Sequence, residues 1–88
     1  MRAVSKKRAR DRKRRAAIRE QVFERDQGCR LRTVQTAGAC FGPPTPHHLK
    51  KASQGGSYDL QNLVQLCAGH NGWVEDHPSE AREVGMVR

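Results

Sequence analysis

The chain has 88 residues, of which 35% are hydrophobic and 30% are charged, and its formal net charge at pH 7 is +8. This length allows one small domain whose limited core usually needs a staple, and three cysteines, an odd number, argue against a closed disulfide framework and for a reducing compartment. Because no apolar run approaches the roughly 20 residues of a membrane span and no apolar signal segment opens the chain, we expect a soluble, cytoplasmic protein with no membrane partner.

The positive charge is concentrated near the N-terminus. Residues 1–32 contain 13 Lys or Arg and four acidic residues, whereas residues 33–88 contain four and five. Such an imbalance implies a polyanionic partner, usually nucleic acid. We predict that residues 1–15 form a basic, flexible arm, disordered or a fraying helix in solution, and that residues 16–88 form the domain; a solubilising tail or a localisation signal is the alternative. The candidate nucleic-acid contacts are Lys6, Lys7, Arg8, Arg10, Arg12, Lys13, Arg14, Arg15, Lys50 and Lys51.

A helix is predicted from about Ala16 to Glu24. Ile18 and Val22 are four residues apart and can form an apolar stripe on one helix face. Gly28 then stands at a plausible C′ position, where a helix often ends. Residues 29–46 read as an irregular segment, because a glycine and two prolines at residues 42–44 interrupt regular structure.

The C-terminal half of the chain has the pattern of a β-hairpin followed by two helices. Short apolar runs flank a glycine-rich turn, and a proline stands where a last helix would begin. The predicted elements are a strand over His47–Lys50, a turn over residues 53–57, a strand over Leu63–Leu66, a helix from Ala68 to about Glu75 and a helix over Pro78–Val84.

Cys67 and His70 stand at the start of a predicted helix with the spacing of a metal-binding pair. Cys29 and Cys40 could supply the other two ligands of a closed, tetrahedral Cys3His zinc site. Such a site would tie the N-terminal helix to the hairpin, which suits a core too small to hold alone. The Cys29 to Cys40 spacing is weak evidence by itself, and buried free thiols are the alternative.

His47 and His48 are adjacent on the first predicted strand. Neighbouring side chains on a strand point to opposite faces, so with a local bend one histidine can bind a metal while the other addresses a water molecule. A lone histidine is more often a surface or hydrogen-bonded core residue, and we interpret His77 in this way. Trp73 is interpreted as a core anchor and not as a platform for base stacking.

A series of short motifs extends from about Val22 to Gly85. They are Phe23-Glu24-Arg25-Asp26, the cysteine before Arg30-Leu31, His47-His48-Leu49, Gln54-Gly55-Gly56, Asn62-Leu63-Val64, Leu66-Cys67, Gly72-Trp73-Val74 and His77-Pro78. In order and spacing they resemble the HNH endonucleases of the His-Me finger (ββα-metal) group, in particular the short bacteriophage-type HNH proteins. The resemblance implies an α+β fold, a small zinc-stapled ββα-metal finger with a basic N-terminal helix and a short C-terminal helix.

The resemblance also implies metal-dependent hydrolysis of DNA phosphodiester bonds that leaves 5′-phosphate ends. His48 would be the general base that removes a proton from the attacking water, and Asn62 would hold the loop and orient His48. His47 would be a ligand of a single catalytic Mg²⁺ or Mn²⁺ ion. In phage relatives such proteins often accompany DNA-packaging proteins, which are therefore implied partners in the host-cell cytoplasm. We expect a monomer.

The sequence departs from the family pattern at its third signature residue. The family usually has a histidine about nine positions after the asparagine, and here that position is Asn71. We interpret the signature as an HNN variant, with Asn71 as second ligand of the catalytic ion and His70 on zinc. In the competing register His70 is the third signature residue and zinc has cysteines only. Glu75 is a further departure, to which we attach no role.

Two other functions remain open at this stage. The first is a non-catalytic, zinc-stabilised nucleic-acid-binding module whose signature has decayed at Asn71. The second is a small basic accessory protein that binds another protein and merely holds zinc. A nicking test with and without a divalent ion separates an enzyme from a binding module.

Overall fold

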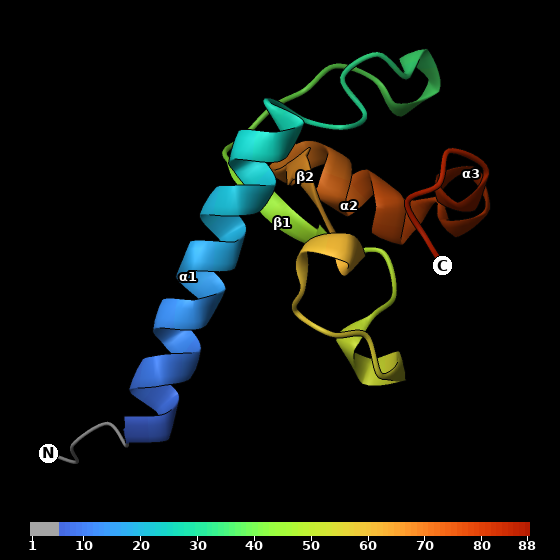
Figure 1. The fold of residues 1–88 in the computed structure, drawn as a ribbon. Helices are drawn as coiled ribbons and strands as arrows, with labels where there is room; N and C mark the ends of the chain where they lie inside the picture. Colours follow the sequence, from blue (N-terminus) through green and yellow to red (C-terminus); the bar gives the residue numbers. More distant parts are fainter. Residues whose placement is uncertain (1–5) are drawn as a thin grey trace, which may run out of the picture.

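The computed structural model describes residues 6–88, so residues 1–5 of the predicted arm lie outside it. The elements in chain order are α1 (Lys6–Asp26), β1 (Pro44–His48), β2 (Leu63–Cys67), α2 (Ala68–Asp76) and α3 (Pro78–Glu83), with short 3-10 turns η1 (Gln35–Ala37), η2 (Ala52–Gln54) and η3 (Leu60–Asn62). Figure 1 shows a two-stranded sheet with α1 on one side and α2 on the other. The α+β class predicted from the sequence is confirmed.

The sheet is an antiparallel hairpin in which His47 is opposite Val64 and His48 is opposite Leu63. β1 therefore covers residues 44–48 and not the predicted His47–Lys50. Prolines lack a backbone N–H, and two prolines two positions apart can join an edge strand where the missing donor would point away from its neighbour. Pro44 and Pro46 meet this condition, although the sequence predicts an irregular segment over residues 29–46 with a break at residues 42–44.

The core lies between the sheet, the C-terminal half of α1 and the two short helices. Val22 of α1, Leu66 of β2 and Ala81 of α3 are completely buried. Ile18, the other residue of the predicted stripe, is half-buried. These few side chains form a small core, which is consistent with the expected need for a staple.

α1 begins at Lys6, ten residues before the start predicted from apolar periodicity. The early part of the helix is exposed and has no acidic residue in its first turn to complement the helix dipole. Two contacts with the loop between the strands hold it. Arg14 forms an ion pair with Asp59 at 2.7 Å, and the Arg15 guanidinium carbon lies 5.1 Å from the centre of the Tyr58 ring. The described part of the predicted arm is therefore helical.

The C-terminal end of α1 also differs from the prediction. The residue in the left-handed conformation is Gln27, with a φ of 57°, and not Gly28, whose φ is 142°. The Gln27 N–H donates to the Phe23 carbonyl at 2.9 Å, which closes the last turn of the helix. Glycine is preferred at such a position but is not required there.

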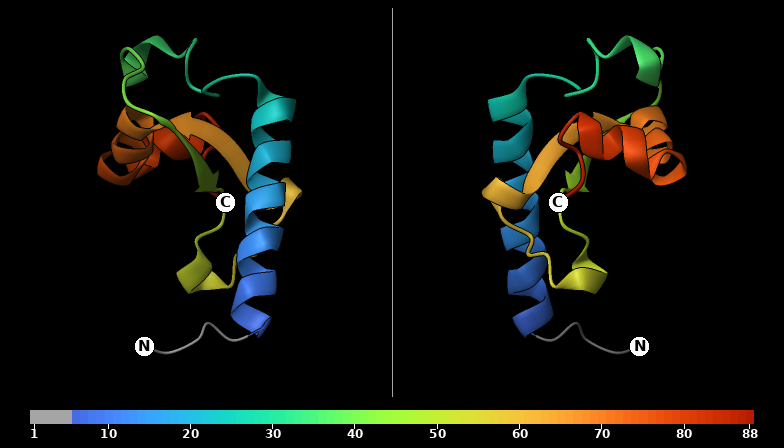
Figure 2. Two further views of the ribbon diagram at one scale, coloured as in Figure 1. Left: turned by 90° about the vertical axis from the view of Figure 1, so that its left-hand side faces the viewer. Right: turned by 90° about the vertical axis from the view of Figure 1, so that its right-hand side faces the viewer.

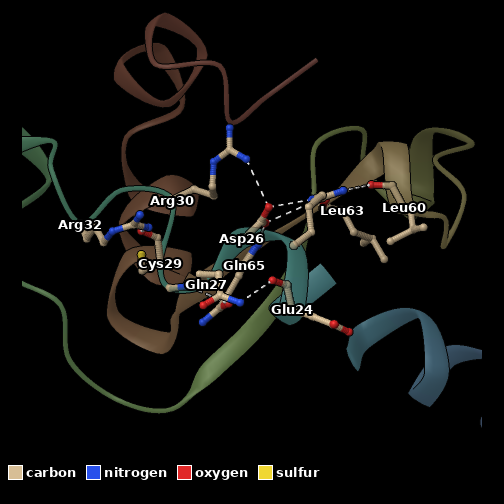
Figure 3. A network of polar contacts seen from close by, with 11 residues as sticks. Glu24, Asp26, Gln27, Cys29, Arg30, Arg32, Leu60, Leu63 and Gln65 are labelled. Carbon is tan, nitrogen blue, oxygen red and sulfur yellow. Dashed lines mark hydrogen bonds and ion pairs between the residues drawn. The ribbon is translucent and has the colours of Figure 1, made fainter. Parts of the chain in front are cut away.

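The free edge of β2 is covered by the C-terminal end of α1 and the segment that follows it (Figure 3). The backbone N–H of Gln65 donates to the Asp26 carboxylate at 2.8 Å, and its carbonyl accepts from the N–H of Arg30 at 2.8 Å. Arg25 also binds Asp26 and donates to the Leu63 carbonyl at 2.6 Å. This network replaces a third strand and fixes α1 to the sheet.

Asp26 is ionised more readily than an ordinary aspartate. Burial alone would raise its pKa, but hydrogen bonds from Arg25 and the Gln65 backbone, with the charges of Arg25 and Arg30, outweigh burial and lower the pKa. The carboxylate is thus a buried, charged part of the fold.

Within residues 6–88, no helix has both the length and the apolar character needed to cross a bilayer.

Candidate functional site

A cluster of three cysteines and one histidine lies where the irregular segment meets the start of α2. The ligand atoms of Cys29, Cys40, Cys67 and His70 all lie within 4.8 Å of one another. Zinc is bound at about 2.3 Å by sulfur and 2.0–2.1 Å by nitrogen, so tetrahedral ligand atoms are roughly 3.5 Å apart. The His70 Nδ1 atom lies 3.1 Å from the Cys29 sulfur and 3.5 Å from the Cys40 sulfur. The cluster can hold a metal ion such as zinc.

The tautomer of His70 suits metal binding. Its Nε2 atom lies 2.9 Å from the Gly38 carbonyl oxygen. A carbonyl can only accept a hydrogen bond, so Nε2 must carry the proton. A neutral imidazole then has its lone pair on Nδ1, the atom that faces the sulfurs. This geometry favours the interpretation that places His70 with the cysteines over the competing register, in which His70 is the third signature residue of the catalytic site.

The thiols of the cluster influence one another. Burial alone would raise the pKa of Cys67, but the backbone N–H groups of His70 and Phe41 and the other two thiols lower it. The pKa of Cys40 is raised to about 11 by desolvation and by its bonds to Cys29 and Cys67 and their charges. Negative charge on one sulfur opposes ionisation of the next, and a bound cation would remove this conflict.

A second group of polar side chains lines a pocket of about 230 Å³ between β1 and α2. The lining residues are Pro46, His47, His48, Lys51, Ala52, Asn71 and Glu75. The pocket thus brings together both histidines and the asparagine that sequence reasoning placed in one site. His70 and Asn71, although adjacent in sequence, face different centres.

His47 is 7% exposed and held in a defined orientation. Its Nε2 atom lies 2.8 Å from the Met86 carbonyl oxygen, after α3. By the same argument as for His70, Nε2 carries the proton and the lone pair of a neutral ring lies on Nδ1. The segment after α3 therefore sets the histidine tautomer, a role that the sequence did not suggest for Met86.

The side-chain amide of Asn71 is oriented by Thr45. The Thr45 hydroxyl donates to the Leu66 carbonyl at 2.8 Å, so its oxygen must accept in the 2.8 Å contact with Asn71. The atom of Asn71 that faces Thr45 is therefore the Nδ2 donor. This leaves Oδ1, an acceptor and potential cation ligand, free of that bond.

His48 is half-buried, and its ring packs edge-on against Tyr58 with 5.6 Å between ring centres. Burial, followed by the charges of His47 and Arg15, lowers the pKa of His48 below its usual value. The ring is then neutral at pH 7 and can accept a proton.

Asn62 lies outside the pocket and is 5% exposed. Its side chain accepts from the N–H of Lys50 at 2.9 Å and donates to the carbonyls of Lys50 and Ser57 at 3.1 and 2.9 Å. All these bonds are to the backbone of the loop that follows β1. Asn62 thus holds that loop closed, and none of these three bonds goes to His48.

Glu75 is the pocket residue to which sequence reasoning gave no role. It stands one helical turn after Asn71, so both side chains project from the same face of α2. The i, i+4 spacing was a signal that could have identified it. Its carboxylate lies 3.5 Å from the Lys51 ammonium, in an exposed pair of little strength.

The predicted nucleic-acid contacts fall in two places. Those of the arm whose side chains are described lie on α1, and Arg14 among them is paired with Asp59. Lys50 and Lys51 follow β1, with Lys51 at the pocket. Basic side chains therefore approach the histidine pocket from α1 and from the loop.

The two aromatic side chains of α2 and its C-terminus pack on one another. Trp73 is half-buried against the core and stacks on His77, with 5.2 Å between ring centres and 19° between ring planes. His77 is exposed and contacts the Trp73 carbonyl at 3.1 Å. Neither residue lines the histidine pocket.

Comparisons with models of known protein families, with curated proteins and with solved structures gave no significant match to this chain.

Proposed function

We propose that this chain is a metal-dependent endonuclease that hydrolyses phosphodiester bonds in DNA, an HNN variant of the HNH type. One observation carries the proposal: His47 and His48 from β1 and Asn71 from α2 line one pocket, although 22 residues separate His48 from Asn71. A chance grouping of polar side chains has no reason to include these three.

The proposed fold is a zinc-stapled ββα-metal finger. Its two strands would be β1 and β2 and its helix α2, which follow one another in the required order. Zinc would be held by the Cys3His cluster defined above. Cys29 and Cys40 come before the hairpin, Cys67 ends its second strand and His70 follows in α2, so the ion would cross-link the two ends of the finger.

His48 would remove a proton from the attacking water. A general base must be unprotonated at the working pH, and the lowered pKa of His48 supports this role. Asn62 would act as a positioning residue, because its three backbone bonds hold the loop that leaves β1 at His48. The expected products carry 5′-phosphate and 3′-hydroxyl ends.

The pocket offers a donor set that fits a hard divalent ion. Asn71 would provide an amide oxygen and Glu75 a carboxylate oxygen, the donors that Mg²⁺ or Mn²⁺ prefers, and His47 would add an imidazole nitrogen. When bound, such an ion would stabilise the negative charge that develops on the leaving oxygen. Thr45 and the Met86 carbonyl would keep the Asn71 and His47 donors correctly oriented.

The test is cleavage of supercoiled plasmid by the purified, zinc-loaded chain with Mg²⁺ or Mn²⁺. Conversion to nicked or linear DNA is expected, with loss of activity when the divalent ion is omitted and in His48→Ala. His77→Ala is the matched control, because it removes a histidine outside the pocket and should leave cleavage unchanged. Equal loss in both histidine variants, or cleavage that persists in His48→Ala, contradicts the assignment.

A second candidate is a non-catalytic, zinc-stabilised nucleic-acid-binding module. The contact between Lys51 and Glu75 favours it, since a cation from the chain itself already faces the carboxylate of the pocket. This candidate predicts DNA binding without cleavage under every divalent-ion condition. The same plasmid experiment, with a binding measurement beside it, distinguishes the two functions.

A further inference from the structure

A pocket of about 280 Å³ lies on the side of α1 that faces the loop between the strands. Its lining residues are Arg12, Arg15, Ala16, Arg19 and Tyr58. Three arginines and no acidic residue line this space. The volume is several times the roughly 30 Å³ that a water molecule occupies in the liquid, so it can admit a phosphodiester group.

The three arginines share one helix face. Their spacings of three and four residues place them one above another along α1. Like charges at these spacings repel, and among residues 6–88 no ion pair with an acid neutralises them. By contrast, Arg14 and Arg25 on the same helix are paired with Asp59 and Asp26.

Tyr58 connects this pocket to the histidine pocket. The Arg15 guanidinium carbon lies 5.1 Å from the Tyr58 ring centre, and the His48 ring centre lies 5.6 Å from it. Arg15 and His48 are therefore separated by no more than about 11 Å, roughly three nucleotide steps at 3.4 Å each. The cation–π contact also holds the Arg15 side chain before any ligand arrives.

We propose that Arg12, Arg15 and Arg19, with Tyr58, form a phosphate-binding subsite that holds the backbone of a DNA strand within a few nucleotides of His48. Guanidinium groups bind phosphate through paired hydrogen bonds, and the site recognises charge and not base sequence. The inference rests on the proposed nuclease function and adds Arg19 and Tyr58 to the residues that contact DNA.

The rigidity of α1 makes the subsite different from a flexible basic arm. η3 lies against α1 level with the middle of the helix in Figure 2, and the Leu60 carbonyl of η3 accepts a hydrogen bond from Arg25. The Arg14–Asp59 ion pair and the Arg15–Tyr58 contact attach the helix to the loop before η3. The arginines are thus presented at a fixed place relative to the histidine pocket, as positioning of a strand requires.

The test is the salt dependence of binding to a fluorescently labelled 20-base-pair DNA duplex by the full, zinc-loaded chain, with Ca²⁺ as the divalent ion and the intact strand verified by gel. The pocket variant carries Arg12→Gln, Arg15→Gln and Arg19→Gln. The matched control carries Arg30→Gln, Arg82→Gln and Arg88→Gln, which removes the same charge from residues outside the pocket and outside the set of predicted nucleic-acid contacts.

Each lost phosphate contact should reduce the slope of log K against log[salt] by about 0.9. The pocket variant is expected to lose two to three phosphate contacts, and the control less than one, with the slope reduced in proportion. Equal changes in the two variants, or an unchanged slope in the pocket variant, overturn the subsite. If the triple substitution alters helix content, Arg15→Gln against Arg82→Gln gives the same comparison with one contact.

Cleavage measured separately in Mg²⁺ keeps the two proposals distinct. Arginine-dependent binding without cleavage by the wild-type chain would remove the nuclease and leave the subsite. Cleavage by a wild-type chain whose DNA affinity does not depend on the pocket arginines would remove the subsite and leave the nuclease.

Discussion

At the scale of single residues, Thr45 controls the chemistry of Asn71 without entering the pocket. Its hydroxyl is the reason that the Asn71 amide presents oxygen and not nitrogen as its unbound end. Replacement by valine keeps the shape of the side chain and removes the hydroxyl. The amide would then be free to rotate, and a cation would have to select one of two orientations.

We therefore expect Thr45→Val to raise the Mg²⁺ concentration needed for half-maximal cleavage about tenfold, the lower end of the range for residues that support metal ligands. Thr45→Ser retains the hydroxyl and should restore most of the lost affinity. A Mg²⁺ titration of plasmid nicking measures the effect, with zinc content as the control for folding. Similar behaviour of the serine and valine variants would show that the hydroxyl is not involved.

Asp26 provides a residue-scale prediction about stability. Its folded pKa is lowered, so the charged form is favoured by folding. The resulting stability is complete above the unfolded pKa near 3.8 and is lost as the pH falls through the lower, folded pKa. Asp26→Asn lacks this contribution at every pH.

The expected loss for Asp26→Asn is about 2 kcal/mol in the free energy of unfolding at pH 7, the usual size for hydrogen bonds to a charged group. The difference between wild type and variant should shrink as the pH falls below about 4. Urea titrations of both proteins at several pH values measure this difference. Protonation of the Cys3His cluster by acid affects the two proteins equally and therefore cancels in the comparison. A difference that stays constant down to pH 2 would contradict the role of the charge.

The sequence pointed to the histidines and Asn71 through the order and spacing of motifs that resemble the HNH endonucleases. Thr45 and the carbonyl of Met86 could not be found in this way, since a threonine and a backbone group carry no chemical signature until the fold brings them to a ligand. Glu75 lies between these cases. Its helical spacing from Asn71 was visible, but only the pocket shows that both residues face β1.

At the scale of elements, the hairpin loop depends on one glycine. A Cβ atom at Gly56 would overlap with the backbone carbonyl of Lys50, which the Asn62 side chain also binds. The loop is thus closed by two interactions at Lys50: the close approach of the Gly56 backbone and the hydrogen bond from the Asn62 side chain. Gly72, in the middle of α2, has open space around it.

Gly56→Ala should lower the free energy of unfolding by about 2 kcal/mol, because the backbone must shift to accept the added atom. Gly72→Ala should raise it by about 0.5–1 kcal/mol, since alanine is favoured over glycine inside a helix. Urea denaturation measures both. Equal effects of the two substitutions would show that the close approach at Lys50 is not a constraint on the loop.

The elements whose boundaries rest on local signals were predicted well. α2, α3 and β2 each end within about one residue of the prediction, because proline, glycine and apolar spacing mark their limits. The start of α1 and the position of β1 were wrong. Contacts with Asp59 and Tyr58, which are distant in sequence, support the early start of α1. β1 contains Pro44 and Pro46, which lie in the segment predicted to be irregular.

At the scale of the whole molecule, α2 carries residues of two different centres. His70 in its first turn, with Cys67 at its N-cap, belongs to the Cys3His cluster, whereas Asn71 and Glu75 face the histidine pocket. The sequence predicted this division through the HNN register but left a competing register open. Which of two adjacent residues turns toward which centre depends on the placement of the helix against β1, which is a tertiary property.

The division predicts that the two centres fail in different ways. Cys67→Ser is a sharp probe of the cluster, because serine can still accept the helix-capping hydrogen bond that the Cys67 sulfur receives from the His70 N–H, while it is a poor zinc ligand. We expect this variant to lose zinc and to melt at least about 10 °C lower, the shift that roughly 2 kcal/mol produces in a domain of this size. DNA binding and cleavage should be lost together as the fold loosens.

His48→Ala should behave in the opposite way. The side chain is not a member of the cluster, so zinc content, melting temperature and the salt slope of DNA binding should stay close to wild type while cleavage falls below detection. Zinc analysis, thermal melting, DNA anisotropy and plasmid nicking on the two variants, with His77→Ala beside them, give the comparison. If His48→Ala also loses zinc, or if its melting temperature falls as far as that of Cys67→Ser, the histidine pocket is part of the structural centre. The description of α2 as a helix with two separate functions would then be wrong.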